Sequence, residues 1–267
     1  MRKSLVLPMN NPVLTAKVKK VSKENYRVTT VEIDAVMNAR PGQFLMVWVP
    51  GVGERPMSIG NADPLTISVA NVGKVSGAIS KLRAGDQISY RGPLGRDFSV
   101  PHNAKRILAI GGGYGVVPLY FLCRRAKEHG IEAVAVVGAR TVKDIIYEKQ
   151  LFAVCGEVFV TTDDGSRGKK GTVMADAEWL ISSKKFDAVY ACGPERMMTA
   201  VASLCTRHGV PCQVSVERYM KCGVGVCGSC AINGRLACVD GPVFNAVEVL
   251  GLDEFGAVHR DATGKKC

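Results

Sequence analysis

Four cysteines near the C-terminus constrain the fold of this chain more than any other feature. They are spaced C-x4-C-x2-C-x7-C, as Cys222, Cys227, Cys230 and Cys238. Three glycines lie among them, at Gly223, Gly225 and Gly228. Thiolate sulfurs are soft ligands for metal ions. Glycine tolerates positive φ and lets backbone N–H groups approach a negatively charged centre closely. The pattern therefore predicts a loop folded around a metal centre.

The spacing of these cysteines separates the possible centres. The opening C-x4-C-x2-C is typical of a plant-type 2Fe–2S site. An Asn233-Gly234 pair before Cys238 predicts a tight turn between two short strands. Four-thiolate zinc sites usually have two C-x2-C pairs, and only Cys227 and Cys230 are so paired. The spacing favours 2Fe–2S, with zinc and unligated cysteines as alternatives. We expect three apolar side chains to shield the cluster, those of Met220, Val224 and Val226.

Composition narrows the class of protein. The 267 residues suffice for two domains and a small third. No apolar run is long enough for a membrane helix or a signal peptide. Ten cysteines without a secretory signal favour the cytoplasm over a disulfide framework. The net charge of +11 comes from scattered basic residues without interleaved aromatics. It therefore favours phosphate-bearing cofactors or an acidic partner over nucleic acid.

The residue pattern divides the chain into three parts. Short β-branched runs with Gly and Pro between them predict a small antiparallel barrel. These runs are 13–21, 26–33, 44–49, 65–70 and 87–90, with Gly or Pro at 41–42, 50–53, 60–64, 85 and 92–95 and a short helix at 77–83. After Pro101, apolar strands alternate with helical segments, which predicts a parallel, doubly wound sheet. The predicted strands are 106–110, 133–137, 158–162, 188–192 and 213–216. We expect an α+β multidomain chain with boundaries at 1–102, 103–216 and 217–267.

Two motifs outside the cysteine loop indicate nucleotide cofactors. Gly111–Gly115 joins a buried strand to a helix, a natural place for a pyrophosphate. It departs from G-x-G-x-x-G because Val116 or Pro118 takes the third glycine position. Arg55-Pro-Met-Ser58 lies on a predicted barrel strand, where arginine can neutralise a diphosphate and serine can bond a flavin ring nitrogen. An ordinary proline-bearing edge strand is the alternative for this tetrad.

Together these motifs resemble the ferredoxin–NADP reductase family, in which a flavin-binding barrel precedes a nicotinamide-binding α/β domain. The resemblance covers nearly the whole chain and is carried by residues 55–58, 73–76, 92–95, 111–115 and 192–194. The cysteine segment, ending in Val239–Phe244, narrows it to the iron–sulfur electron-transfer subunits of class B dihydroorotate dehydrogenase. Residues 138–140 and 162–166 are also similar to that family.

The resemblance implies a role for each matched residue. FAD would be bound by Arg55, Pro56, Met57, Ser58, Ser68, Val69, Ala70, Val75 and Ser76. The NAD cofactor would lie against Gly112, Gly113, Gly115, Cys192, Gly193 and Pro194. The 2Fe–2S cluster would be held by Cys222, Cys227, Cys230 and Cys238. No side chain is expected to act as a catalytic acid or base, because hydride transfer between flavin and nicotinamide requires mainly stacking and orientation.

The three cofactors also imply an order. A cluster carries one electron at a time, nicotinamide takes two as hydride, and flavin can do both. The expected route runs from an FMN-containing dihydroorotate dehydrogenase subunit through the cluster and FAD to NAD, in pyrimidine biosynthesis. The assembly would be a cytoplasmic hetero-oligomer, with a heterotetramer as the expected form.

Other uses of the same modules remain open. One alternative is the diaphorase-type subunit of a hydrogenase or of a ferredoxin:NAD(P) oxidoreductase, and another is a non-enzymatic, zinc-stapled binding module. For the nicotinamide cofactor, Arg140 would suit a 2′-phosphate, whereas Asp163 and Asp164 favour the free ribose of NAD.

Overall fold

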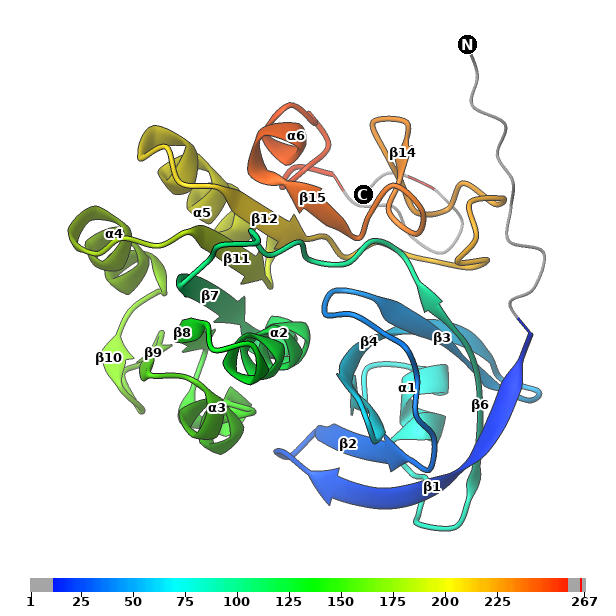
Figure 1. The fold of residues 1–267 in the computed structure, drawn as a ribbon. Coiled ribbons are helices and arrows are strands. Elements are labelled where there is room, and N and C mark those ends of the chain that lie inside the picture. Colours follow the sequence, from blue (N-terminus) through cyan, green and yellow to red (C-terminus); the bar gives the residue numbers. More distant parts are fainter. Residues whose placement is uncertain (1–11, 259–264, 266–267) are drawn as a thin grey trace.

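The computed structural model describes residues 12–258 and residue 265. A β-barrel and an α/β unit stand side by side, and the C-terminal segment lies across both (Figure 1). This arrangement confirms the predicted fold class. The extreme ends of the first and third predicted domains, 1–11 and most of 259–267, lie outside the described residues. No helix in the described part of the chain is long and apolar enough to cross a membrane.

The barrel consists of six antiparallel strands that close in the order β1-β2-β5-β4-β3-β6. They are β1 (Leu14–Lys23), β2 (Val28–Ile33), β3 (Phe44–Val49), β4 (Gly53–Ala62), β5 (Leu65–Ala70) and β6 (Gln87–Leu94), with helix α1 (Lys74–Ile79) between the last two. Apolar side chains such as Val31, Ile67 and Ile79 fill the interior. Burying them provides most of the driving force for closure.

Three predictions for the barrel were wrong in detail. Strand β6 continues through Gly92 and Pro93 to Leu94, where the sequence suggested a break at 92–95. The helix begins at Lys74, earlier than the predicted 77. Strand β4 continues through Gly60 to Ala62, where the sequence suggested a break at 60–64. A Cβ on Gly60 would lie 3.0 Å from a Cγ of Val117. Gly60 therefore allows a helix of the α/β unit to approach the strand closely, rather than ending the strand.

The α/β unit is built on a sheet of seven strands in the order β10-β9-β8-β7-β11-β12-β15. The strands are β7 (Arg106–Gly112), β8 (Glu132–Ala139), β9 (Glu157–Thr162), β10 (Lys169–Lys170), β11 (Ala188–Cys192), β12 (Cys212–Ser215) and β15 (Val243–Asn245). All pairs are parallel except β12 with β15. The sheet is thus the predicted parallel sheet with one added antiparallel edge strand.

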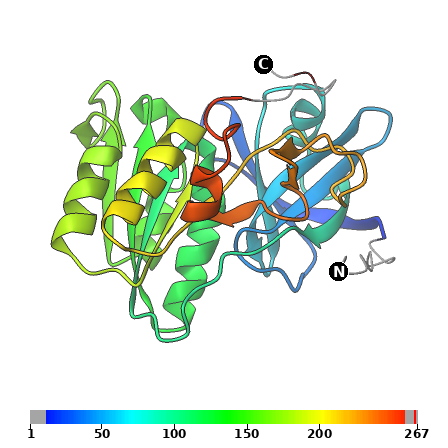
Figure 2. The same cartoon turned by 90° about the horizontal axis from the view of Figure 1, so that it is seen from above.

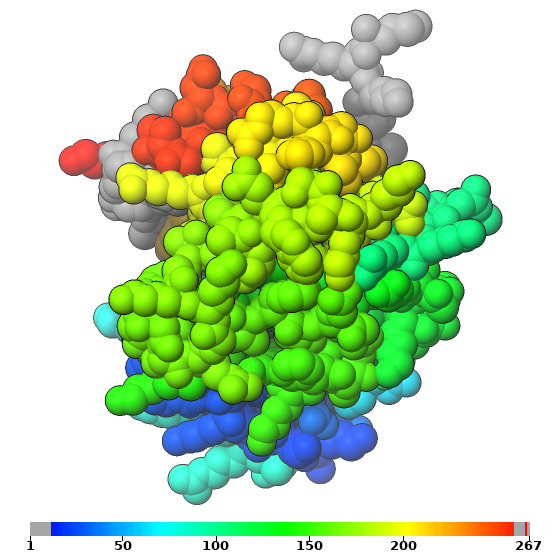
Figure 3. Space-filling view, turned by 90° about the vertical axis from the view of Figure 1, so that its left-hand side faces the viewer, coloured from blue at the N-terminus to red at the C-terminus, as the bar shows by residue number. Residues whose placement is uncertain are grey.

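Helices cover both faces of this sheet. They are η1 (Gly113–Gly115), α2 (Val116–Glu128), η2 (Val142–Asp144), α3 (Glu148–Val154), α4 (Met174–Ser183), α5 (Glu195–Arg207) and α6 (Ala246–Leu250). Along β7, Leu108 and Ile110 join the core that contains α4 and α5, whereas Ile107 and Ala109 join the core with α2 and α3. A strand buried on both faces reads as a continuous apolar run, which is why 106–110 was predicted correctly. Figure 3 shows the outer face of this unit.

The C-terminal segment contacts both larger parts. Its hairpin, β13 (Ala231–Ile232) and β14 (Arg235–Leu236), turns through Asn233 and Gly234, both at positive φ. This confirms the predicted Asn-Gly turn. The cysteine loop and hairpin pack against the barrel, whereas β15 pairs with β12 at the sheet edge and α6 packs in the core beside α5 (Figure 2). The four cysteines of the loop therefore lie on the barrel rather than on the α/β unit.

Candidate functional site

The four cysteines of the loop lie in two pairs. The backbone N–H of Cys227 donates to Cys222 Sγ over 3.4 Å, and the two side chains hydrogen-bond as well. The thiols of Cys230 and Cys238 hydrogen-bond each other. Among the residues that the structure describes, no three metal-binding side chains converge on one ion position. The loop thus presents two thiol pairs, which lie close enough to interact electrostatically.

Paired thiols fit a two-iron centre better than a single zinc ion. A structural zinc site brings all four sulfurs around one atom in a tetrahedron. A 2Fe–2S cluster is held by four thiolates distributed over two irons. The donor set and its division into Cys222 with Cys227 and Cys230 with Cys238 therefore suit the cluster.

The loop also lowers the pKa of two of its thiols. Partial burial acts to raise the pKa of Cys227, but hydrogen bonds with Ser229 and Cys222 outweigh it and set the value at about 6. The hydrogen bond with Cys238 lowers the pKa of Cys230 to about 7, and the same bond raises the pKa of Cys238. Because the thiolate is the metal ligand, this surrounding favours metal binding near neutral pH.

Glycine allows the loop to pack closely on the barrel. Gly223 has φ of 69°, and a Cβ there would lie 2.8 Å from Cγ of Met46 on β3. Beneath the loop, an apolar cluster joins barrel and cysteine segment. Its buried members are Phe44, Met46, Leu94, Met220, Cys230, Ala237 and Cys238. Any other residue at position 223 would be strained and would push the loop off β3.

Of the three side chains expected to shield the cluster, two are buried or half-buried and the third is exposed. Met220 is buried, and Val224 packs against the same apolar cluster. Val226, however, is 72% exposed. It lies next to Cys227, the exposed cysteine of the four. The loop is therefore covered on its barrel side and open on its outer side.

The main flavin candidates meet along strand β4. Arg55, Pro56 and Met57 are half-buried, and Ser58 is exposed. Helix α1 lies against this strand, since a Cβ on Gly53 would come 3.3 Å from a Cγ of Val75. The strand that carries residues 55–58 therefore contacts the helix that carries Val75 and Ser76, through Gly53 and Val75.

Arg55 has a partner that the sequence did not indicate. Its guanidinium lies 4.8 Å from the ring centroid of Tyr219, just before the cysteine loop. The same guanidinium donates to the backbone oxygen of Glu54 over 2.8 Å. Aromatic faces attract guanidinium groups, so Arg55 links the predicted flavin strand to the segment that carries the cluster cysteines.

The second group of flavin candidates, on β5, can offer little side-chain contact. The Ser68 hydroxyl is hydrogen-bonded to Thr30, at 2.7 Å, and to Tyr147, at 2.9 Å. The Val69 side chain is fully buried in the barrel core. Ala70 is half-buried at the strand end. A cofactor here would meet backbone and the Ala70 methyl.

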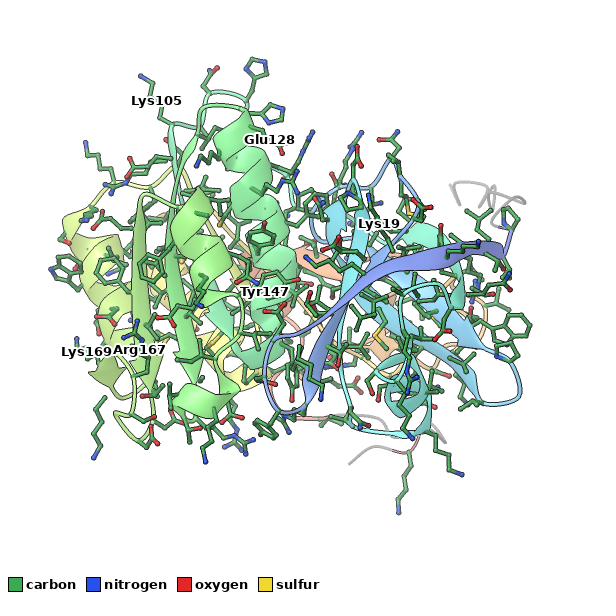
Figure 4. All side chains as sticks on the ribbon, turned by 90° about the horizontal axis from the view of Figure 1, so that it is seen from below. Lys19, Lys105, Glu128, Tyr147, Arg167 and Lys169 are labelled. Carbon is green, nitrogen blue, oxygen red and sulfur yellow. The ribbon has the colours of Figure 1, made fainter. Side chains whose placement is uncertain are left out.

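Tyr147 joins the two large units, and sequence reasoning missed it. Its φ of 60° is rare for a non-glycine residue. It contacts Ser68 of the barrel and packs edge-on against Tyr120 of α2, with ring centroids 5.1 Å apart. Figure 4 shows it at the junction of the two units. An isolated tyrosine in a loop gives no sequence signal for such a role.

The two predicted nicotinamide loops lie in direct contact. A Cβ on Gly115 would overlap the carbonyl of Cys192, and one on Gly193 would lie 2.9 Å from the Gly112 backbone. A Cβ on Gly112 would lie 2.7 Å from Cδ of Pro194. These glycines are required by close packing of one loop on the other. The structure therefore brings 112–115 and 192–194 together at the carboxyl ends of β7 and β11.

A residue of the barrel reaches the same glycine loop. The Arg27 guanidinium, between β1 and β2, lies 5.1 Å from the ring centroid of Tyr114 and 5.6 Å from that of Tyr26. The Tyr26 hydroxyl donates to Asp144 of the α/β unit over 2.9 Å. No motif in the sequence indicates these contacts. They tie the first barrel hairpin to the predicted nicotinamide site.

Charged groups surround the carboxyl end of the sheet. The Asp164 carboxylate accepts hydrogen bonds from the Ser166 hydroxyl and backbone N–H, at 2.6 and 2.9 Å, which lower its pKa. Arg167 pairs with Glu148 at 2.8 Å, and Lys169 pairs with Asp176 at 3.2 Å. Figure 4 shows Arg167 and Lys169 at the opposite end of the sheet from Lys105 and Glu128.

A buried ion pair fixes the start of the cysteine segment. Arg218 donates to the Glu195 carboxylate at the first turn of α5, and both side chains are almost fully buried. Glu195 also accepts from the Gly256 backbone N–H over 2.8 Å. Removing one partner of such a pair leaves an uncompensated buried charge. The pair thus holds residue 218 and the C-terminal turn next to the Cys192–Pro194 loop.

Two family models match parts of this chain. The model of the iron–sulfur cluster binding domain of dihydroorotate dehydrogenase B matches residues 217–250. The oxidoreductase NAD-binding domain matches residues 109–203.

Curated relatives match almost end to end. A Methanocaldococcus jannaschii protein named probable dihydroorotate dehydrogenase B (NAD(+)), electron transfer subunit, is 38% identical, over 97% of this chain and 99% of its own length. A Methanopyrus kandleri protein of the same name is 43% identical, over 84% of this chain and 86% of its own.

Solved structures show the same fold. A chain of the NADH-dependent reduced ferredoxin-NADP oxidoreductase, studied for flavin-based electron bifurcation, is 32% identical with a TM-score of 0.79 and covers 89% of each chain. The ferredoxin reductase of carbazole 1,9a-dioxygenase is 21% identical with a TM-score of 0.64, over 76% of this chain and 68% of its own, and supports the fold alone.

Proposed function

Because the chain belongs to the family of dihydroorotate dehydrogenase B electron transfer subunits, we propose that it serves dihydroorotate oxidation in pyrimidine biosynthesis. It receives electrons from an FMN-containing catalytic subunit and delivers them to NAD+. The observation that carries this proposal is the packing of the cysteine loop on the barrel that bears Arg55–Ser58. That packing puts the candidate cluster site beside the candidate flavin site.

The chain's own residues would bind and orient three groups. The cluster supplies single electrons, FAD exchanges one or two, and NAD+ takes a hydride. The thiol pairs of the loop hold the irons. Arg55 and Ser58, with Val75 and Ser76, hold FAD, and the abutting loops at 112–115 and 192–194 position the nicotinamide. The contacts of Arg27 and Tyr147 fix the angle between the barrel and the sheet. That angle sets how closely the flavin ring and the nicotinamide ring can approach each other.

We also propose NAD as the nicotinamide cofactor, the cytoplasm as the compartment, and three domains. The basic side chains Arg167 and Lys169 already pair with carboxylates, which supports NAD over a 2′-phosphorylated cofactor. The thiols of nine described cysteines are free, which supports a reducing cytoplasm. Residues 1–102, 103–216 and 217–267 would serve FAD, NAD and the cluster, with β15 and α6 anchoring the third part to the second.

A reconstitution experiment tests the proposal. The chain is co-expressed with an FMN-containing dihydroorotate dehydrogenase partner, and the complex is purified without oxygen. Adding dihydroorotate should produce NADH, detected at 340 nm, and the partner alone should not produce it. Failure of the two proteins to associate, or an intact complex with FAD and cluster that reduces no NAD+, would refute this assignment.

A second function is favoured by one specific observation. The 32% identity to a chain of the NADH-dependent reduced ferredoxin-NADP oxidoreductase extends over 89% of both chains. A diaphorase-type role with ferredoxin as the partner would use the same modules. In the same assay, reduced ferredoxin in place of dihydroorotate separates the two, since rapid NAD+ reduction by ferredoxin without the FMN subunit supports the second function.

A further inference from the structure

Arg91 connects the flavin strand to the cysteine loop. It lies on β6, opposite Met46 of β3. Its Nε and Nη2 donate to the two oxygens of the Glu54 carboxylate, at 2.7 and 2.8 Å. Nη2 also donates to the backbone oxygen of Cys222 over 2.5 Å. One guanidinium thus joins Glu54, next to Arg55, to the first cysteine of the loop, 131 positions away from Arg91.

The bridge lies in surroundings where charge has a strong effect. The Arg91 and Glu54 side chains are 15% and 22% exposed. Bidentate arginine–carboxylate pairs are among the strongest hydrogen-bonded contacts, and partial burial reduces screening by water. Any charge fixed here acts on the cluster site at short range.

Attachment of the loop does not by itself require an arginine. Gly223 packs on Met46 and Leu94, and Met220 is buried in the same apolar cluster. That cluster already fixes the loop on β3 and β6. The arginine therefore adds something that apolar packing cannot supply, namely a positive charge and a fixed hydrogen bond at the Cys222 carbonyl.

We propose that Arg91 is a positioning residue for electron exchange, which holds the Cys222 end of the loop against β4 and raises the reduction potential of the cluster. This inference rests on the proposed function, because it requires a cluster in the loop. Accepting one electron adds one negative charge to the cluster. A nearby positive charge stabilises that reduced form more than the oxidised one, and charge and hydrogen bonding are among the factors that set cluster potentials.

Two substitutions with opposite expected signs test the proposal. Arg91→Gln removes the charge but can still donate a hydrogen bond to Cys222, and it should lower the midpoint potential. The expected shift is about tenfold in the ratio of reduced to oxidised cluster, or about 59 mV for one electron. Glu54→Gln removes the opposing negative charge and should raise the potential. Arg91→Lys keeps the charge and should remain close to the wild-type potential.

The readout is an electron paramagnetic resonance titration of the purified full-length chain, with iron and FAD contents measured alongside. Arg124→Gln is the matched control, because Arg124 is paired with Glu128 on α2 and lies on another element. Clusters with wild-type potential in both Arg91→Gln and Glu54→Gln would overturn the inference and leave the proposed function intact. A wild-type chain that binds zinc and no iron would overturn both. If Arg91→Gln does not fold, the sign of the Glu54→Gln shift decides.

Discussion

The cysteines of the loop and those of the α/β unit are the same residue in opposite surroundings. Hydrogen bonds set the pKa of Cys227 at about 6 and that of Cys230 at about 7. In the α/β unit, burial raises the pKa of Cys192 to about 12. The hydrogen bond that the Cys123 thiol donates to Cys155, together with burial, raises the pKa of Cys123. Within the loop, the thiol of Cys238 has a raised pKa as well, because it donates a hydrogen bond to Cys230. The contrast with the α/β unit therefore holds for Cys227 and Cys230, the two loop thiols that ionise most readily.

The difference also shows how the two regions use glycine and apolar residues. In the loop, glycines at positive φ expose backbone N–H groups around the thiols, and one side remains open to solvent at Val226. In the sheet and helices, Cys123 and Cys205 are fully buried as small apolar side chains. The cysteine loop is therefore suited to binding a metal centre and exchanging electrons with a partner, whereas the cysteines of the α/β unit are suited to packing in its core.

The largest expected effect on the cluster comes from replacing one cysteine of the loop, with one cysteine of the α/β unit replaced as the control. Cys227→Ser removes a ligand from one of the two pairs and should abolish the paramagnetic signal of the reduced cluster, while FAD remains bound. Cys155→Ser, at the end of α3, is the matched control and should keep the signal. Iron content and flavin absorption measured on both variants check the result. A full paramagnetic signal in Cys227→Ser, or an equal loss of signal in both variants, would contradict the claim that only the loop cysteines hold the cluster.

The contact between Gly115 and Cys192 allows a test of the two nicotinamide loops. Gly115→Ala places a methyl group against the Cys192 carbonyl, so the two loops must separate. A displacement of about 1 Å can cost about 10²-fold in rate, and NADH-driven flavin reduction should fall by that order, with cluster and FAD retained. Gly156→Ala is the control, since its Cβ would meet Glu132 at an ordinary 3.4 Å. Stopped-flow absorbance measures both variants, and equal rates would contradict the proposed loop contact.

The raised pKa of the half-buried Cys192 thiol predicts a decline in stability at alkaline pH. A thiol ionises near pH 9 in the unfolded chain, but Cys192 stays protonated in the folded state up to about pH 12. Its contribution is complete below pH 9 and is lost between these values. The free energy of unfolding should fall by up to about 1.4 kcal/mol per pH unit for such a group. Urea unfolding at pH 8 and pH 10 measures this, and Cys192→Ala should show a smaller fall. The same slope in both proteins would contradict the assigned burial.

The smallest effect distinguishes the two sides of the loop. Val226 is exposed, so Val226→Ser should change the free energy of unfolding by no more than about 0.5 kcal/mol. Val224 packs on the apolar cluster beneath the loop, and Val224→Ser should cost about 1–3 kcal/mol. Urea unfolding of the purified chain gives both values. A larger loss for Val226→Ser would mean that the outer side of the loop is covered.

Most of the fold could be predicted from local patterns. The apolar run 106–110 and the Asn233-Gly234 turn carry their structure in their own residues. Gly60 could not be interpreted correctly, because its role depends on Val117 of a distant helix. The antiparallel addition of Val243–Asn245 to the sheet edge also depends on a partner strand far away in sequence.

The residues of the candidate site also fall into those with a local sequence signal and those without one. Cysteine spacing and the glycine loops are local signals, and the structure brings their residues together. Arg91, Tyr147 and Tyr219 have no motif, because their partners are distant in the chain. The residues that connect the cofactor sites were therefore visible only in three dimensions.

Metal and sulfide analysis tests the central claim most directly. If the two thiol pairs hold a 2Fe–2S cluster, the anaerobically purified chain should contain about two irons and about two acid-labile sulfides per chain, without zinc. One zinc per chain with neither iron nor sulfide would contradict the account. The loop would then be a structural zinc site, and this chain would have no cluster to accept electrons from a partner.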